Sequence, residues 1–186
     1  VVPSNVQEGK ENYIIKGIGP RALKSSKVKE ITFQDDCSIT SFKRDSLFCH
    51  TLQKITFPLK LSKLEQGWCD FTLSLSQIDL GEENGNFIFE DGVLYDNQKT
   101  ILYFCSRKKS SITIPSSVKI IGSYAFEQCK RLETVQFEEP SSLEEIQPWA
   151  FSRSHLRRIR IPKGVKDIRY NAFFWCKRLR NLEFEE

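Results

Sequence analysis

Apolar residues recur along the chain in a fixed order that is clearest near the C-terminus. One copy reads Val118-x-x-Ile121-Gly122-x-x-Ala125-Phe126-x-x-Cys129-x-x-Leu132-x-x-Val135-x-Phe137. Two further copies begin at Leu143 and Val165, at spacings of 25 and 22 residues. A repeat of this length with one apolar side predicts a solenoid, because a single unit cannot bury that side without its neighbours.

The same template fits the first half of the chain less closely. Copies begin near residues 15, 39 and 61, so the chain holds six copies in all, the later three starting at 118, 143 and 165. The ending L-x-x-V-x-F predicts one short strand per copy, with apolar residues pointing inward and alternate residues facing outward. The I-G-x-x-A-F segment predicts a return leg, in which residues 123–129 form one or two helical turns and Gly122 permits a tight corner. We therefore expect an α/β solenoid, a right-handed leucine-rich repeat array with a parallel sheet on its concave side.

The period fails between the third and fourth copies. Asp91-Gly92 lies between alternating apolar residues, a pattern typical of a two-residue hairpin turn with positive φ. Residues 96–99 predict a second turn. We expect a small antiparallel hairpin insertion at about 86–105, followed by a strand at Ile112-Thr113-Ile114 that rejoins the solenoid. Residues 1–186 are then expected to form a single leucine-rich repeat domain.

The composition agrees with a folded repeat array. With 39% hydrophobic and 28% charged residues, 186 residues can bury a core without disulfides or a metal. No apolar run of about 18 residues is present, so we expect no membrane insertion within this stretch. The sequence contains no methionine, even at position 1. We therefore expect a fragment of a longer protein.

The repeated units resemble a known family. Together with Phe89-Glu90-Asp91-Gly92-Val93-Leu94-Tyr95-Asp96, they are similar to the BspA-like class of leucine-rich repeat proteins, in which such a hairpin commonly interrupts the array. Residues 136–143 most resemble the expansions of this class in trichomonad protists; related members occur in oral and gut bacteria and in treponemes. The resemblance implies a cell-surface or secreted protein in adhesion and host–pathogen interaction. It implies no catalytic residues, because the class shares none.

No catalytic or metal-binding pattern stands out. Cys49, Cys129 and Cys176 each precede a strand leucine by three residues, which indicates a repeated structural position filled by free, buried thiols. Disulfides remain an alternative for a secreted parent. The neighbours Cys49 and His50 should point apart, and the chain has no C-x-x-C, G-x-S-x-G, P-loop or H-E-x-x-H motif. We expect no enzyme activity, cofactor or metal site.

Positive charge gathers near the C-terminus. Residues 150–186 hold ten Lys and Arg against four acids, which leaves the remainder slightly acidic. A solvated surface explains such a run, and a basic patch for a glycosaminoglycan or an acidic protein is the alternative. We expect no nucleic-acid binding, because no exposed aromatic residues interleave with the arginines.

These observations favour a non-catalytic protein-interaction or adhesion module that binds a protein or cell-surface partner. Arg158 and Arg160, two residues apart on one strand, should grip a carboxylate or sulfate bidentately. An intracellular scaffold and a glycosaminoglycan-binding module are the alternatives, and self-association is expected if Leu182 and Phe184 lie at an open end of the core. The expected partner-binding residues are Arg158, Arg160, Arg157, Thr134, Gln136, Thr113 and Thr56.

Overall fold

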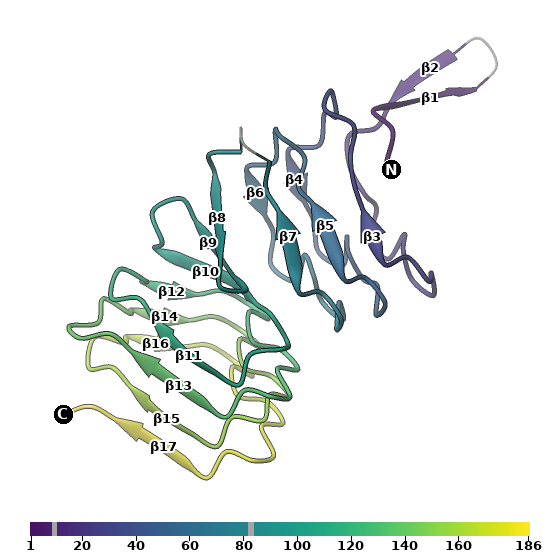
Figure 1. Ribbon diagram of the computed structural model, residues 1–186. Coiled ribbons are helices and arrows are strands. Elements are labelled where there is room, and N and C mark those ends of the chain that lie inside the picture. The colour runs from purple at the N-terminus through teal and green to yellow at the C-terminus, as the bar shows by residue number, and fades with distance from the viewer. Residues whose placement is uncertain (9–10, 82–83) are drawn as a thin grey trace. The chain divides into compact units, whose positions relative to one another are not determined.

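The structure, a computed structural model, describes residues 1–8, 11–81 and 84–186. The chain divides into two compact units, Val1–Phe89 and Glu90–Glu186. Each unit is built from stacked coils whose strands form parallel ladders (Figure 1). Across the described residues the regular structure is strand alone, without a helix. The solenoid prediction is therefore confirmed, but as a β-solenoid.

The first unit has two ladders and an antiparallel strand pair. The main ladder contains β3 (Glu30–Ile31), β5 (Lys54–Thr56) and β7 (Gln77–Asp79). The second ladder contains β4 (Ser41–Phe42) and β6 (Lys63–Leu64). β1 (Asn5–Glu8) pairs antiparallel with β2 (Glu11–Ile14), an arrangement that the repeat template does not predict.

The second unit repeats this plan more regularly. Its main ladder contains β11 (Ser111–Ile114), β13 (Thr134–Phe137), β15 (Arg158–Ile161) and β17 (Asn181–Phe184). Its second ladder contains β10 (Ile101–Cys105), β12 (Ile120–Ile121), β14 (Glu145–Ile146) and β16 (Asp167–Ile168). Each regular coil therefore contributes two strands, where the sequence predicted one.

The predicted hairpin is present. β8 (Phe87–Glu90) leads through Asp91 and Gly92, with φ of 45° and 75°, into β9 (Val93–Asp96). β9 then pairs antiparallel with β10, and the Asp96 carboxylate accepts hydrogen bonds from the backbone of Thr100 and Ile101 at 2.6 and 2.8 Å. β10 also pairs in parallel with β12, so the insertion supplies the first strand of the second ladder.

The core follows the predicted template. Leu132 is fully buried, Val135 is 6% exposed, and Phe137 is partly buried against the same cluster. In the last coil, by contrast, Leu182 and Phe184 are 38% and 63% exposed. The right-handed coil, the concave position of the sheet and the single domain stay predictions.

The helical turns expected at residues 123–129 are wrong. Tyr124 and Gln128 have φ of 61° and 53°, and left-handed residues four apart interrupt an α-helix. The backbone N–H groups of Phe126 and Gln128 donate instead to Ala150 and Ser152 of the next coil, at 2.7 and 2.9 Å. Hydrogen bonds between coils thus replace those that a helix would form within itself.

Candidate functional site

The outward side chains of the main ladder in the second unit form aligned rows. Ser111 lies beside Thr134, Thr134 beside Arg158, and Arg158 beside Asn181. In a second row, Thr113 lies beside Gln136, and Arg160 lies beside Glu183. These side chains are exposed or half-buried, as the two-residue period of a strand predicts. We call this surface the strand face.

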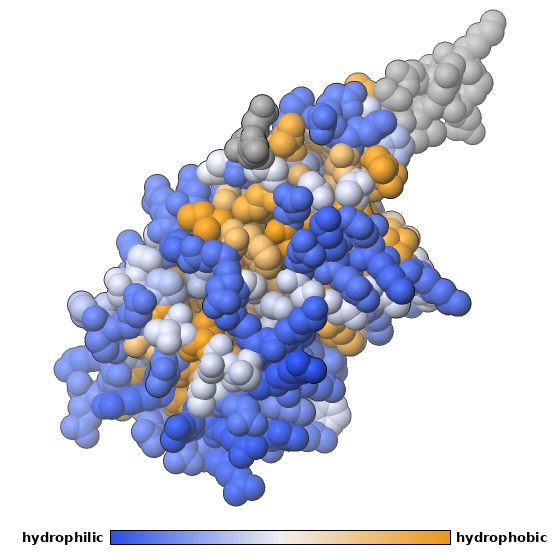
Figure 2. Space-filling view, viewed as in Figure 1, coloured by the Kyte–Doolittle hydropathy of each residue, from blue (hydrophilic) through white to orange (hydrophobic). Residues whose placement is uncertain are grey.

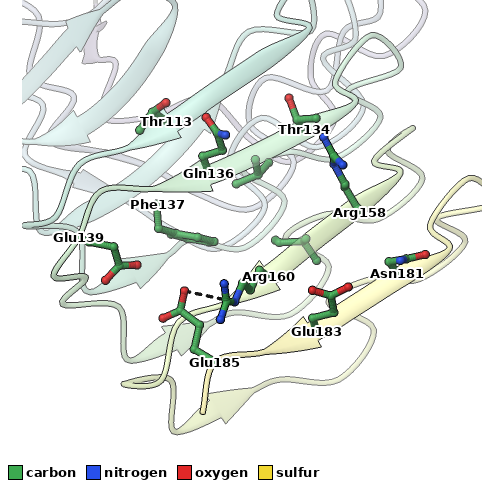
Figure 3. Close-up of a pocket in the computed structure, with 12 residues that line it drawn as sticks. Thr113, Thr134, Gln136, Phe137, Glu139, Arg158, Arg160, Asn181, Glu183 and Glu185 are labelled. Atoms are coloured by element: carbon green, nitrogen blue, oxygen red, sulfur yellow. Dashed lines mark ion pairs between the residues drawn. The ribbon is translucent and has the colours of Figure 1, made fainter.

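An open depression of about 620 Å³ lies on the strand face (Figure 3). Five of the seven expected partner-binding residues line it: Thr113, Thr134, Gln136, Arg158 and Arg160. The half-buried ring of Phe137 adds an apolar element. Around these strands the visible surface is mainly hydrophilic (Figure 2). The site is therefore a broad surface on which polar and charged side chains surround apolar groups of Val135, Phe137 and Ile159.

The charge of the strand face is mixed. Glu139, Glu183 and Glu185 also line the depression, and Glu185 lies 3.7 Å from the Arg160 guanidinium. Among the described residues, no carboxylate lies within ion-pair distance of Arg158, whose side chain extends toward Thr134 in Figure 3. Glu139 and Glu185 were missed because each follows the end of a strand, where the alternating pattern no longer applies. Arg158 is therefore the arginine on this surface that remains available to a partner.

Two expected residues lie elsewhere. Arg157 points away from the depression into an ion pair with Glu133 at 3.0 Å. It lines a second depression of about 400 Å³ with Lys177, Arg178 and Arg180. Thr56 belongs to β5 of the first unit, where it is half-buried opposite Asp79.

The C-terminal basic residues do not all lie on one surface. Lys166 pairs with Glu144 at 2.8 Å, and Arg169 pairs with Glu145 at 2.8 Å, both along the second ladder. Arg158 and Arg160 lie on the strand face instead. Adjacent residues of a strand point to opposite sides, so a charge run that crosses strands and turns is distributed over several surfaces.

The recurring cysteine position is a hydrogen-bonding position. The Cys129 thiol donates to the backbone oxygen of Cys105 at 3.8 Å, and the Cys176 thiol donates to that of Phe151 at 3.0 Å. A small donor thus satisfies a carbonyl group of the preceding coil, which supports the structural role. All six cysteines carry free thiols; five are buried and Cys176 is half-buried.

The environment of Cys129 changes its acidity. Burial raises the pKa of this thiol, but the hydrogen bond with the Cys105 side chain and the nearby Arg107 guanidinium together lower the pKa to about 7. The Arg107 Nη1 atom lies 3.7 Å from the sulfur. Both cysteine side chains are 0% exposed, so this chemistry lies inside the core.

Neither a cluster of metal-ligand side chains nor a membrane-spanning helix is found among the described residues. Within residues 1–8, 11–81 and 84–186, no three His, Cys, Asp or Glu side chains gather as metal ligands would. The same residues contain no helix with the length and apolar character needed to cross a membrane.

Comparison with solved structures supports the fold. A leucine rich cell surface protein from Faecalibacterium prausnitzii A2-165 is 22% identical with a TM-score of 0.54; the match covers 98% of this chain and 46% of that protein. The pneumococcal vaccine antigen PcpA is 16% identical with a TM-score of 0.57, covering 98% and 72%. A leucine-rich repeat protein from Bacteroides ovatus ATCC 8483 is 18% identical with a TM-score of 0.50, covering 98% and 63%. The chain thus spans about half the length of the F. prausnitzii protein.

Sequence comparison gives a more specific result. No significant match was found among curated protein sequences. Residues 4–98 and 98–186, however, match the family described as BspA type leucine rich repeat region, in six copies. This match extends over nearly the whole chain and agrees with the stacked coils. The chain therefore belongs to the BspA-type leucine-rich repeat family.

Proposed function

We propose that the chain is a non-catalytic protein-interaction module that docks a partner on the strand face of its second unit. The observation that carries the proposal is the depression lined by side chains from four neighbouring strands. Rows of Thr, Gln and Asn side chains there offer hydrogen bonds, Arg158 offers an uncompensated charge, and Phe137 offers apolar contact. Protein interfaces combine these elements, with Arg and aromatic side chains enriched at their centres.

The mixed charge defines the partner more narrowly. A purely acidic partner would meet Glu139, Glu183 and Glu185 as well as the arginines. Like charges brought together at an interface oppose binding. A protein surface that presents a carboxylate to Arg158 and a cation to Glu183 fits better than a uniformly acidic one.

A location at the cell surface, with adhesion to host or matrix proteins, is part of the proposal. Its support is the family and the names of the similar structures, one a cell surface protein and one a vaccine antigen. An intracellular scaffold is the alternative, and six free thiols suit it. Antibody staining of intact and permeabilised cells of the source organism separates the two locations.

Binding to purified proteins tests the docking surface. Wild-type protein is applied to immobilised extracellular matrix proteins and to intact epithelial cells, and equilibrium binding is measured by biolayer interferometry and flow cytometry. The proposal predicts saturable binding that Arg158→Glu abolishes. Lys24→Glu, an exposed change in the first unit, is the matched control and should bind as wild type does. Binding that Arg158→Glu leaves intact would overturn the proposal.

Two further partners remain proposals. Self-association would involve the exposed Leu182 and Phe184, and light scattering across a concentration series tests it. Glycosaminoglycan binding would involve basic residues outside the strand face, such as those that line the second depression.

A further inference from the structure

Basic side chains from three successive turns lie along one edge of the second unit. These turns, residues 129–133, 154–157 and 176–180, each lead into a strand of the main ladder. Backbone hydrogen bonds hold them side by side: Arg157 N–H donates to Glu133 at 3.1 Å, and Arg180 N–H donates to Arg157 at 3.0 Å. We call Lys130, Arg131, Arg157, Lys177, Arg178 and Arg180 the basic edge.

Part of the basic edge comes from a four-residue sequence that occurs in two coils. Cys129-Lys130-Arg131-Leu132 returns as Cys176-Lys177-Arg178-Leu179, so the same two cations follow the structural cysteine in two coils. The three turns hold six cations and one carboxylate, that of Glu133, which pairs with Arg157. All six basic residues are exposed. Neighbouring strands lie about 4.8 Å apart, so cations recur in short, regular steps along the stack of coils.

We propose that the basic edge binds a linear sulfated polysaccharide lying across the stacked turns. A chain of sulfated sugars presents anions in a row, and guanidinium groups grip sulfate oxygens bidentately. Such a chain could bind in the second depression, which has a volume of about 400 Å³ and is lined by Arg157, Lys177, Arg178 and Arg180. This site uses none of the residues that line the depression on the strand face.

The surroundings of Trp175 favour a sulfated glycan over nucleic acid. Tyr170, Phe174 and Trp175 are 65%, 41% and 58% exposed, so the expectation that no exposed aromatic side chains interleave with the basic residues is wrong. Two cations lie over the Trp175 ring, however: Lys177 Nζ is 4.4 Å from the ring centroid and the Arg153 guanidinium is 5.9 Å from it. Single-stranded nucleic acids are held by bases that stack on free aromatic faces. A polyanion without bases needs no such face.

Two double variants with the same loss of charge test the site. Lys130→Ser with Lys177→Ser removes cations from the first and last turns of the edge. Lys24→Ser with Lys27→Ser, both at exposed positions of the first unit, is the matched control. The probes are a heparin dodecasaccharide, its desulfated form and a single-stranded oligonucleotide, measured by titration calorimetry at several NaCl concentrations.

The site predicts that heparin binds wild-type and control protein alike. The edge variant should bind heparin about tenfold more weakly. The slope of its log binding constant against log NaCl concentration should fall by roughly one to two, the number of cations removed. The desulfated chain should not bind. Absence of heparin binding, equal weakening by both variants, or tighter binding of the oligonucleotide would overturn the inference. Arg158→Glu should leave heparin binding unchanged. The experiment therefore tests the basic edge separately from the proposed docking of a protein on the strand face.

Discussion

The rings of Phe126 and Phe151 stack face to face, with centroids 4.7 Å apart and planes only 4° from parallel. Phe173 continues the column beyond Phe151, at 5.1 Å and 3°. The three residues occupy the same template position in successive coils. The repeat in the sequence is therefore a repeat of contacts, in which each coil buries the ring of its neighbour.

Phe151→Ala should lower the free energy of unfolding by about 3–5 kcal/mol, because it removes a fully buried ring from the middle of the column. Urea denaturation monitored by circular dichroism measures the loss. Phe184→Ala, at a position 63% exposed, is the control and should cost less than about 1 kcal/mol. A loss below about 1 kcal/mol for Phe151→Ala would show that the column is not a core.

Gly122 is required for close packing. A Cβ atom at this position would lie 2.8 Å from the backbone oxygen of Leu102, and its φ is not in the left-handed region that favours glycine. Gly122→Ala should therefore cost about 1–3 kcal/mol in urea denaturation. Gly19→Ala is a matched control at the same template position, because a Cβ atom there meets nothing within 4 Å. Equal stability of the two variants would contradict this role.

The thiols should react slowly in the folded protein and completely in denaturant, because five are buried and Cys176 is half-buried. Titration with a chromogenic disulfide reagent counts them, and Cys176 should react first. Cys176→Ser keeps the donor to Phe151 and should remove that first phase. Isolation of Cys129 or Cys176 in a native disulfide would refute the assignment of six free thiols.

Stability should fall at alkaline pH through Tyr95. Burial, and then the negative charge of Glu90, raise the pKa of this side chain well above its usual value of 10. The folded state thus holds the proton more tightly, so the contribution to stability is complete below about pH 10 and is lost as pH rises toward the folded-state pKa. The loss is at most about 1.4 kcal/mol per pH unit.

Tyr95→Phe cannot ionise and should lose less stability between about pH 8 and about pH 11 than wild type. Urea denaturation at both pH values gives the comparison. Tyr170→Phe, at a position 65% exposed, should follow wild type. Parallel losses in wild type and Tyr95→Phe would contradict the assignment.

Features set by local chemistry could be predicted from the sequence. The hairpin at Asp91-Gly92 follows from the positive φ that its turn requires, and the outward position of Arg158 follows from the two-residue period of a strand. The turns at residues 123–129 could not be predicted this way, because their Ala and Phe spacing also suits a helix. The choice between a helix and these turns depends on the hydrogen bond from the Phe126 N–H to the Ala150 oxygen, and the two residues belong to different coils.

In the candidate site too, residues within strands could be predicted from the sequence, whereas residues just outside strands could not. The strand period places Thr113, Thr134 and Gln136 on one surface, and the structure brings them together. Arg157 and Glu185 lie just outside strands, where turn geometry decides the direction of a side chain. Arg157 therefore points away from the strand face and pairs with Glu133. Glu185 points toward the strand face, where it neutralises part of the charge of Arg160.

The claim that the strand face docks a protein partner is tested most directly by the salt dependence of binding when both arginines are replaced. Arg158→Ser with Arg160→Ser is compared with wild type and with the Lys24→Ser, Lys27→Ser control, on the matrix protein or cells that bind wild type. The only ion pair lost among the described residues is the long, partly exposed Arg160–Glu185 pair, so the free energy of unfolding should change by less than about 1 kcal/mol. We predict binding at least about tenfold weaker and less sensitive to NaCl, with the control unchanged. Binding by the arginine variant equal to that of wild type at every salt concentration would contradict the claim.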